Sequence, residues 1–284
     1  MNAKSTPQTP AIKDWLKVAA ERLTLAGIPS ANLDAEIILS SAIDQNRTYL
    51  HAHPEIIIDT DKLDIANSKL ELRLKRIPIA YIEGHKEFYG RDFIVDKNTL
   101  IPRPESEDII EILNQLLSPI IENLPNSNLV DVGTGSGCLG ISAKLEFPKL
   151  DVTLTDISLD ALNVASQNAK VLSVNVAILQ SNLLESYPKE PYIIIANLPY
   201  VNRGWDRSPE TNHEPSLALF ANDNGLSVIK RLITQASNKL SDKGYLMLEA
   251  DPTQHDSIIS FANKHLFKLE IQKNYILVFL KTAK

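Results

Sequence analysis

The sequence predicts an α/β chain in which a small all-α helical bundle precedes a doubly wound parallel sheet with a terminal antiparallel hairpin. Three observations carry this prediction. Residues 12–76 show apolar residues at helical spacing with no strand between the segments. Residues 129–248 alternate short β-branched runs with helical segments, as parallel βαβ units do. The closing strands 269–272 and 276–280 are so close in sequence that they are expected to form a hairpin.

The first part of the chain is expected to hold helices at 12–26, 32–42 and 60–76. The first of these repeats its apolar residues at one face, and Gly27 and Pro29 end it. We expect a disordered tail over residues 1–10, a helical domain over 11–79, a β-hairpin linker over 80–98 and the α/β domain over 99–284. His51 and His53 are expected to have a surface or loop role, because no third metal ligand lies near them in the sequence, and no metal site is predicted.

Composition limits the classes of function. The 284 residues carry a formal net charge of -6, which disfavours a nucleic-acid backbone as partner and fits a protein or small-molecule substrate better. The single cysteine, Cys138, excludes an internal disulfide framework and agrees with a reducing compartment. The first residues lack the apolar core of a signal peptide and no apolar run is long enough for a membrane span, so we expect a cytoplasmic protein with no membrane partner.

The α/β part alternates regularly. Its expected strands and helices are, in order, 129–132 (strand), 138–146 (helix), 152–155 (strand), 159–172 (helix), 176–179 (strand), 192–196 (strand), 226–240 (helix), 244–248 (strand) and 257–265 (helix). A further helix is expected from about Ser106 to Pro119. Residues 201–224, rich in polar residues and proline, are expected to form a long irregular loop over the site.

A glycine-rich loop joins the strand 129–132 to the helix that follows it. In Asp131-Val132-Gly133-Thr134-Gly135-Ser136-Gly137 the glycines allow a sharp turn and close approach to a ligand. The next strand ends on Asp156, where a carboxylate can accept hydrogen bonds from two ribose hydroxyls. Residues 135–140 also satisfy the dinucleotide fingerprint, so loop and acid together indicate an adenosine-bearing ligand without naming it. After the third strand, Asn182 could bond an adenine ring and Leu183 could pack on it.

The run Ile193-Ile194-Ile195-Ala196-Asn197-Leu198-Pro199-Tyr200 predicts a buried strand that ends on a polar amide. Pro199 cannot extend a sheet ladder, so Asn197 lies at the carboxyl end of the strand, where open α/β sheets bind ligands. The Asn197 oxygen and the Leu198 carbonyl can each accept one N–H of a planar NH2 group, and Tyr200 can pack on that group. A planar nitrogen is a weak nucleophile that needs orientation, which points to a methyl acceptor.

Six stretches together resemble the HemK/PrmC family of S-adenosylmethionine-dependent protein-(glutamine-N5) methyltransferases, which act on peptide chain release factors. They are Phe88-Tyr89-Gly90, Ile101-Pro102-Arg103-Pro104-Glu105, the glycine loop, Asn197-Leu198-Pro199-Tyr200, His213-Glu214-Pro215 and Leu248-Glu249. The resemblance implies a Rossmann-like class I methyltransferase sheet and its strand order. It implies that the cofactor is held by Gly133, Thr134, Gly135, Ser136, Gly137, Asp156, Asn182, Leu183 and Asn197. It also implies that Asn197, Leu198, Pro199 and Tyr200 hold the glutamine of the Gly-Gly-Gln motif of release factors.

The chain departs from the family pattern at three places. Leu198 stands where the pattern has a proline, Asn182 where an aspartate is usual, and the final hairpin lacks a longer loop. Three alternatives stay open from the sequence: an adenine-N6 methyltransferase acting on RNA or DNA, a glutamine methyltransferase acting on a ribosomal protein, and a non-catalytic binding module with a cofactor fold.

Overall fold

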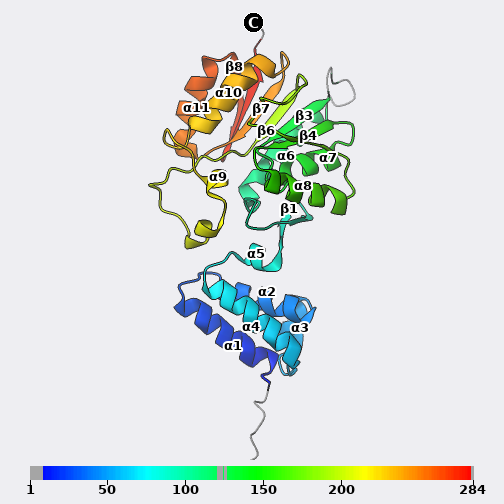
Figure 1. Cartoon of the computed structure of the whole chain (residues 1–284), viewed down its shortest axis with the longest axis vertical. Helices are drawn as coiled ribbons and strands as arrows, with labels where there is room; N and C mark the ends of the chain where they lie inside the picture. Colours follow the sequence, from blue (N-terminus) through cyan, green and yellow to red (C-terminus); the bar gives the residue numbers. More distant parts are fainter. Residues whose placement is uncertain (1–8, 120–123, 125–126, 283–284) are drawn as a thin grey trace, which may run out of the picture. The chain divides into compact units, whose positions relative to one another are not determined.

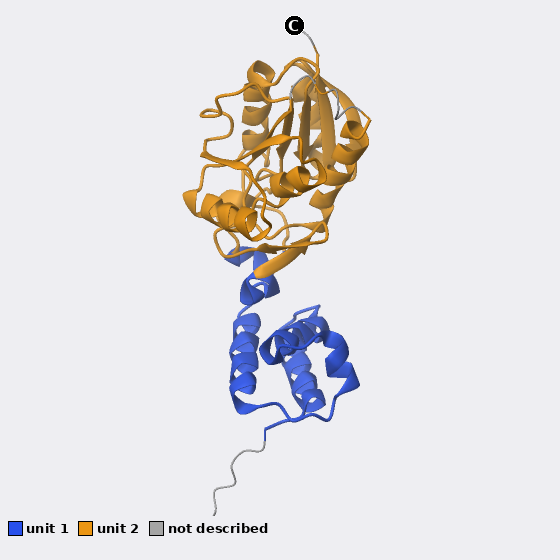
Figure 2. Ribbon diagram, turned by 90° about the vertical axis from the view of Figure 1, so that its right-hand side faces the viewer, with its two compact units in different colours: residues 1–84, 208–213 blue, residues 85–207, 214–284 orange. Residues whose placement is uncertain are grey.

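The computed structural model describes residues 9–119, 124 and 127–282. The chain divides into two compact units, one of residues 1–84 and 208–213 and the other of residues 85–207 and 214–284 (Figure 2). Of the tail expected at residues 1–10, residues 1–8 lie outside the described part. No helix of the described residues combines the length and the apolar character that crossing a lipid bilayer requires.

The smaller unit is built from helices (Figure 1). They are α1 (Ile12–Leu25), α2 (Ala31–Ile43), α3 (Arg47–Ala52), α4 (Thr60–Leu74) and α5 (Ile79–Glu83). The three long helices match the predicted segments, because their periodic apolar residues such as Leu23 and Ile38 are fully buried in one core. No segment is predicted at α3, which is too short to show a period. On α3, His51 lies 3.2 Å from Glu36, an acidic neighbour that the sequence does not reveal.

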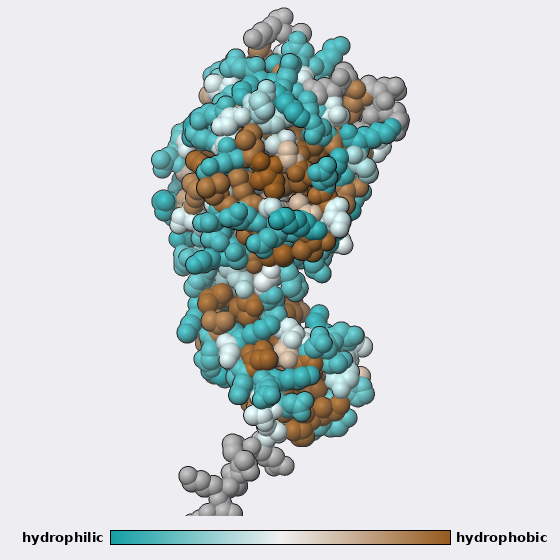
Figure 3. Space-filling view, turned by 45° about the vertical axis from the view of Figure 1, so that its right-hand side comes forward, coloured by the Kyte–Doolittle hydropathy of each residue, from teal (hydrophilic) through white to brown (hydrophobic). Residues whose placement is uncertain are grey.

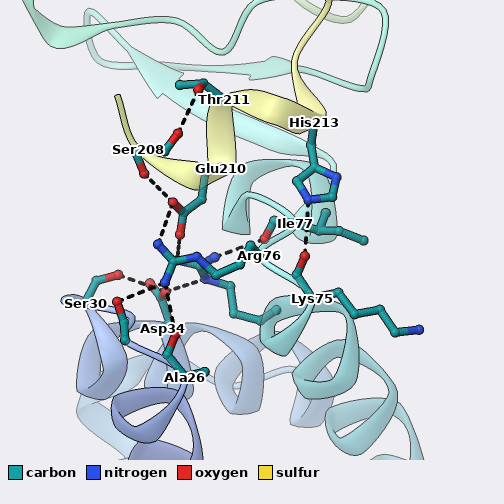
Figure 4. A network of polar contacts seen from close by, with 12 residues as sticks. Ala26, Ser30, Asp34, Lys75, Arg76, Ile77, Ser208, Glu210, Thr211 and His213 are labelled. Carbon is teal, nitrogen blue, oxygen red and sulfur yellow. Dashed lines mark hydrogen bonds and ion pairs between the residues drawn. The ribbon is translucent and has the colours of Figure 1, made fainter. Parts of the chain in front are cut away.

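A polar network ties the segment 208–213 into this helical unit (Figure 4). The buried Arg73 of α4 donates from Nε to Asp34 Oδ2 at 2.7 Å and from a terminal nitrogen to Glu210 Oε1 at 2.9 Å. Arg76 donates to the other Glu210 oxygen at 3.0 Å, and the Ser208 hydroxyl donates to the same carboxylate. Burial alone would raise the pKa of Glu210, but hydrogen bonds from Ser208 and Arg73 and the charge of Arg73 lower it to about 2.

The larger unit is organised around a seven-stranded sheet of order β5-β4-β3-β6-β7-β9-β8 (Figure 1). Strands β3 to β7 run parallel, whereas β9 is antiparallel to β7 and β8 to β9. The strands are β3 (Asn128–Val132), β4 (Asp151–Asp156), β5 (Ala177–Gln180), β6 (Ile193–Ala196), β7 (Tyr245–Glu249), β8 (Phe267–Lys273) and β9 (Ile276–Lys281). The helices are α6 (Glu107–Leu117), α7 (Cys138–Glu146), α8 (Leu159–Val171), α9 (Ser216–Leu219), α10 (Ser227–Lys239) and α11 (His255–Asn263), with 3-10 turns η1 (Pro104–Ser106), η3 (Pro209–His213) and η4 (Pro252–Gln254). The doubly wound fold and its terminal hairpin are as predicted.

Two hydrophobic cores lie on opposite faces of the sheet. Ile193 and Ile195 of β6 face the core formed with α6, α7 and α8, whereas Ile194 and Ala196 face the core formed with α10 and α11. The alternation follows from the two-residue period of a strand, and all four residues are apolar because helices cover both faces.

Figure 3 shows apolar side chains gathered on one face of this unit among hydrophilic ones.

Strand register brings three carboxyl ends together. Asp131 of β3 aligns with Leu154 of β4 on one side and with Ile195 of β6 on the other. The chain runs outward from β3 in one direction and from β6 in the other, so the strand order reverses between these two strands. Ligands of open α/β sheets bind at such a reversal, beyond the carboxyl ends of the strands.

Two segments differ from their expected form. The hairpin predicted over 80–98 is shorter than expected, because α5 occupies its first residues. Its strands are β1 (His85–Phe88) and β2 (Arg91–Ile94), joined by a two-residue turn. The prediction of an irregular loop over 201–224 is wrong in part, because η3 and α9 lie within it and residues 208–213 belong to the helical unit. Helices of four or five residues are too short to leave a helical period in the sequence.

We expect Glu210→Gln to lower the free energy of unfolding at pH 7 by about 2 kcal/mol, because a partly buried carboxylate loses charged hydrogen bonds. The pKa of Glu210 is lowered on folding from 4.5 to about 2, so its contribution is full above pH 4.5 and declines as pH falls towards 2. Urea unfolding monitored by circular dichroism at pH 7 and at lower pH measures both effects.

Glu21→Gln is the matched control, since Glu21 is an exposed carboxylate on α1 with no side-chain partner among the described residues. The network's contribution to stability would be contradicted by equal free energies of unfolding for Glu210→Gln and Glu21→Gln at pH 7. A difference between the two variants that widens on acidification would also contradict it.

Candidate active site

A cleft opens at the carboxyl edge of the sheet, with an empty volume of about 1200 Å³ that includes its open side. Most of the predicted site residues line it: Gly133, Thr134, Gly135, Ser136, Asp156, Asn182, Leu183, Asn197, Leu198 and Pro199. Gly137 and Tyr200 do not contribute to its lining. The lining also includes Leu100, Pro102, Arg103 and Ser106 and, from a later segment, Pro215 and Leu217. A concave, mainly apolar site with a few polar groups is typical of a small-molecule pocket.

The glycine loop lies close to Leu198, another residue that lines the cleft. Gly133 has a φ of +73°, and a Cβ there would lie 2.8 Å from the Leu198 side chain. Gly135, with a φ of +55°, would place a Cβ where no protein atom lies within 4 Å, so its backbone faces open space. A Cβ on Gly140 would lie 2.3 Å from Leu154, so this glycine allows α7 to pack on β4. The loop therefore leaves room for a ligand at Gly135, whereas Gly140 has a packing role.

Asp156 ends β4 and holds the glycine loop from its other side. Its Oδ2 accepts the N–H of Gly135 at 3.0 Å and its Oδ1 accepts the N–H of Ser158 at 2.9 Å. Burial raises the pKa of this carboxyl, although the backbone hydrogen bonds act against the shift. Each oxygen has a further lone pair, so the side chain can still accept two hydroxyls from the cleft.

Asp131 is a second buried acid that organises the loop. Its Oδ2 accepts from the Thr134 hydroxyl at 2.6 Å and from the Gly140 N–H at 2.9 Å. Its Oδ1 is buried and has no hydrogen-bond partner among the described residues. Burial raises the pKa of Asp131 to about 6. The sequence places Asp131 in the loop motif but gives no reason to single it out, because its role depends on the turn that brings Thr134 and Gly140 back to it.

The third loop along this edge contributes an apolar wall. Leu183 is buried, has a φ of +56° and lines the cleft. The Asn182 amide is occupied at both ends, since Nδ2 donates to Glu185 at 2.9 Å and Oδ1 accepts from Arg231 at 3.1 Å. A direct contact of the Asn182 side chain with a ligand would therefore require it to exchange one of these partners.

At the end of β6, Asn197 is part of a chain of hydrogen bonds. Its Nδ2 donates to Ser106 Oγ at 3.0 Å, and the Ser106 hydroxyl donates to Glu249 Oε2 at 2.5 Å. Asn197 Oδ1 has no hydrogen-bond partner in the described part of the chain. Asn197 lines the cleft, so the free oxygen is available there as an acceptor.

Tyr200 does not line the cleft and instead contacts Glu249 and Gln254. Its hydroxyl donates to Glu249 Oε1 at 3.2 Å, and its carbonyl accepts from the Gln254 side chain at 2.9 Å. Burial and the neighbouring Glu249 raise the pKa of Tyr200. The expected stacking of its ring on a substrate group stays a prediction, since the structure gives Tyr200 a supporting contact with Glu249.

The two Pro-containing segments meet at a buried carboxylate. Glu214 accepts from Arg103 at 2.6 Å and from the N–H of Ile101 at 3.2 Å, and it is 6% exposed. Arg103 and Pro215 both line the cleft. The ion pair joins an arginine and a glutamate that are 111 residues apart, and the neighbouring prolines hold each segment extended.

Comparison with known proteins identifies the parts of the chain. A family model described as PrmC N-terminal domain matches residues 14–84, and one described as Methyltransferase small domain matches residues 106–214. A solved methyltransferase from Pyrococcus furiosus shares the fold, with a TM-score of 0.52 and 17% identity over 76% of this chain and 100% of that one.

Two curated relatives define the family. A bifunctional methyltransferase of Rickettsia bellii is 36% identical over 91% of this chain, and the chain spans 52% of that relative's length. The chain thus covers about half of such longer relatives. A release factor glutamine methyltransferase of Leptospira interrogans is 37% identical over 86% of this chain and 87% of its own length. On this likeness along nearly its whole length, the chain belongs to the release factor glutamine methyltransferase family.

Proposed function

We propose that this protein transfers a methyl group from S-adenosylmethionine to the side-chain nitrogen N5 of the glutamine in the Gly-Gly-Gln motif of peptide chain release factors. One observation carries the proposal: Asn197, whose Oδ1 has no hydrogen-bond partner among the described residues, lines the same cleft as Gly135 and Asp156. An acceptor for an amide NH2 and a loop for an adenosine-bearing cofactor thus share one cavity.

The cleft residues fit the cofactor. S-adenosylmethionine supplies a methyl group on a sulfonium sulfur, which is electrophilic. The open space at Gly135 leaves room for the cofactor on the glycine side of the cleft. Asp156 would accept the ribose hydroxyls, Leu183 would pack on the adenine, and the backbone of residues 133–137 would hold the remainder.

The chain's own part in the chemistry is to orient a poor nucleophile. The nitrogen of an amide is planar because its lone pair is delocalised, so it reacts only when it is desolvated and held in line. Asn197 Oδ1 and the Leu198 carbonyl would each accept one N–H of the glutamine, which fixes the plane of its amide. Leu198 keeps the carbonyl that a proline would offer there, and its side chain packs against Gly133.

Substrate recognition is assigned to the helical part, over residues 11–79, with the hairpin region 80–98 as linker and residues 99–284 as the catalytic domain. The reaction would take place in the cytoplasm, where release factors act. The names of relatives at 33 to 37% identity favour a release factor over an adenine base or a ribosomal protein as substrate. The net charge of -6 also disfavours a nucleic acid.

The direct test is methyl transfer from labelled S-adenosylmethionine to three substrates side by side: a purified release factor, its Gly-Gly-Ala variant, and total RNA. We expect label on the first alone. Label on RNA, or equal label on the Gly-Gly-Ala variant, would overturn the proposed substrate.

Asn197→Ala should reduce kcat by about 100-fold or more, because the acceptor that orients the glutamine is lost. Its Kd for the cofactor, measured by calorimetry, should stay within about 2-fold of wild type. Asn163→Ala, an exposed asparagine on α8, is the control. A kcat equal to that of this control would exclude Asn197 from the site.

Asp156→Asn should weaken cofactor binding by about 10- to 100-fold, because a neutral amide replaces a carboxylate that accepts hydrogen bonds. Asp160→Asn, four residues on and exposed, provides the matched charge change. Calorimetry with S-adenosylmethionine decides: equal Kd values for the two variants would rule out the ribose role of Asp156.

A further inference from the structure

Glu249 is a buried carboxylate at the end of β7 that the methyl-transfer chemistry does not itself use. It is 1% exposed, and no ion pair involves it within the described residues. Both of its oxygens accept hydroxyl groups: Oε2 from Ser106 at 2.5 Å and Oε1 from Tyr200 at 3.2 Å. A buried carboxylate without a cation lowers stability, and such groups cluster at functional sites.

The hydrogen bonds around Ser106 have a fixed direction. A serine hydroxyl has a single proton, and an ionised carboxylate can only accept, so the Ser106 proton points at Glu249. The oxygen of Ser106 is then left as an acceptor for its second neighbour. That neighbour is the Asn197 side chain at 3.0 Å, which must present its NH2 group to Ser106.

The two ends of an asparagine amide have nearly the same shape, so packing alone does not select between them. The hydrogen bond to Ser106 does select. With Nδ2 held by Ser106, Oδ1 is the end left for the cleft, where the proposed glutamine NH2 requires an acceptor. In the opposite orientation two NH2 groups would face each other, and the nitrogen to be methylated would lose its alignment.

We propose that Glu249 is a positioning residue that fixes the polarity of the Asn197 amide through Ser106, so that the amide oxygen faces the methyl acceptor. The inference rests on the proposed function, and it adds Glu249 and Ser106 to the residues on which the rate depends. Tyr200 holds the second oxygen of Glu249 and keeps the carboxylate plane in place.

Protonation of Glu249 removes this preference for one orientation of the Asn197 amide. A protonated Glu249 can donate to Ser106, which frees the serine proton for an Asn197 oxygen. Burial raises the pKa of Glu249, whereas the hydroxyls of Ser106 and Tyr200 and the nearby Asn197 amide act against the shift. The other titratable groups that interact with Glu249 are Glu105 and Cys138, and Arg103 and Tyr275 act on Tyr200. We therefore expect kcat to fall on the acid side at a pH above the ordinary value for glutamate.

The first test is Glu249→Gln, which keeps the volume but can donate as well as accept. We expect kcat to fall about 10- to 100-fold, KM and cofactor Kd to change less than about 3-fold, and the acid limb of the kcat profile to disappear. Glu270→Gln on β8, an exposed glutamate, is the control and should retain wild-type kcat. An unchanged kcat in Glu249→Gln, or an acid limb that persists, would overturn the proposal.

A double-mutant cycle distinguishes an action of Glu249 through Ser106, here called the relay, from simple destabilisation of the fold. Ser106→Ala should lower kcat by a similar factor, and the double variant with Glu249→Gln should be no slower than the slower single variant. Ser106→Thr retains the hydroxyl and should recover most of the rate. Multiplicative losses, or equal losses in Ser106→Ala and Ser106→Thr, would contradict the relay.

The final measurement does not depend on activity. In nitrogen-15 spectra, one Asn197 side-chain proton should exchange slowly with water in the wild type and rapidly in Glu249→Gln and Ser106→Ala. Equal exchange in all three would overturn the proposal. The kinetic comparisons use whichever substrate the wild type methylates. Label on RNA would refute the release-factor assignment. It would still allow the test of Glu249, because adenine N6 is also a planar NH2 group.

Discussion

The parallel pairing of β3 with β6 is the constraint on which the rest of the site depends. Leu129 aligns with Ile193 and Asp131 with Ile195, although the two strands are separated in sequence by two further strands and two helices. This pairing puts the start of the glycine loop beside the end of β6. A slip of one residue would turn each β6 side chain towards the opposite core, so the two differently packed faces preserve the register.

Strand β6, which Asn197 directly follows, lies between two strands that each carry a buried acid at or next to their carboxyl end. On one side Asp131 of β3 holds Thr134 and the backbone of Gly140, and on the other Glu249 of β7 holds Ser106 and Tyr200. Both acids are 1% exposed. Burying these carboxylates opposes folding. In return, their hydrogen bonds fix the conformation of the glycine loop and the orientation of the Asn197 amide.

Sequence reasoning reached those features that depend on local pattern. The alternation of strands and helices, the buried β6 and the exit of the chain at Pro199 follow from periodicity and from proline chemistry. The roles of Glu249 and Ser106 could not be reached in this way, because their contact joins residues 143 positions apart. Asn182 illustrates the same limit: its neighbour Arg231, 49 residues on, comes from α10 and determines what its amide can do. The short α3 and α9 leave too few residues for a period.

The assignment of residues 208–213 to the helical unit has a consequence for dissecting the protein. The chain passes between the units at residue 84, again at 207 and back at 213, so no single cut in the polypeptide divides one folded unit from the other. A fragment that begins at His85 would carry Glu210 without Arg73 and Arg76, leaving a carboxylate that the intact chain neutralises twice. Each unit is therefore built from two separate stretches of the polypeptide, and a variant meant to isolate one unit has to include both of its stretches.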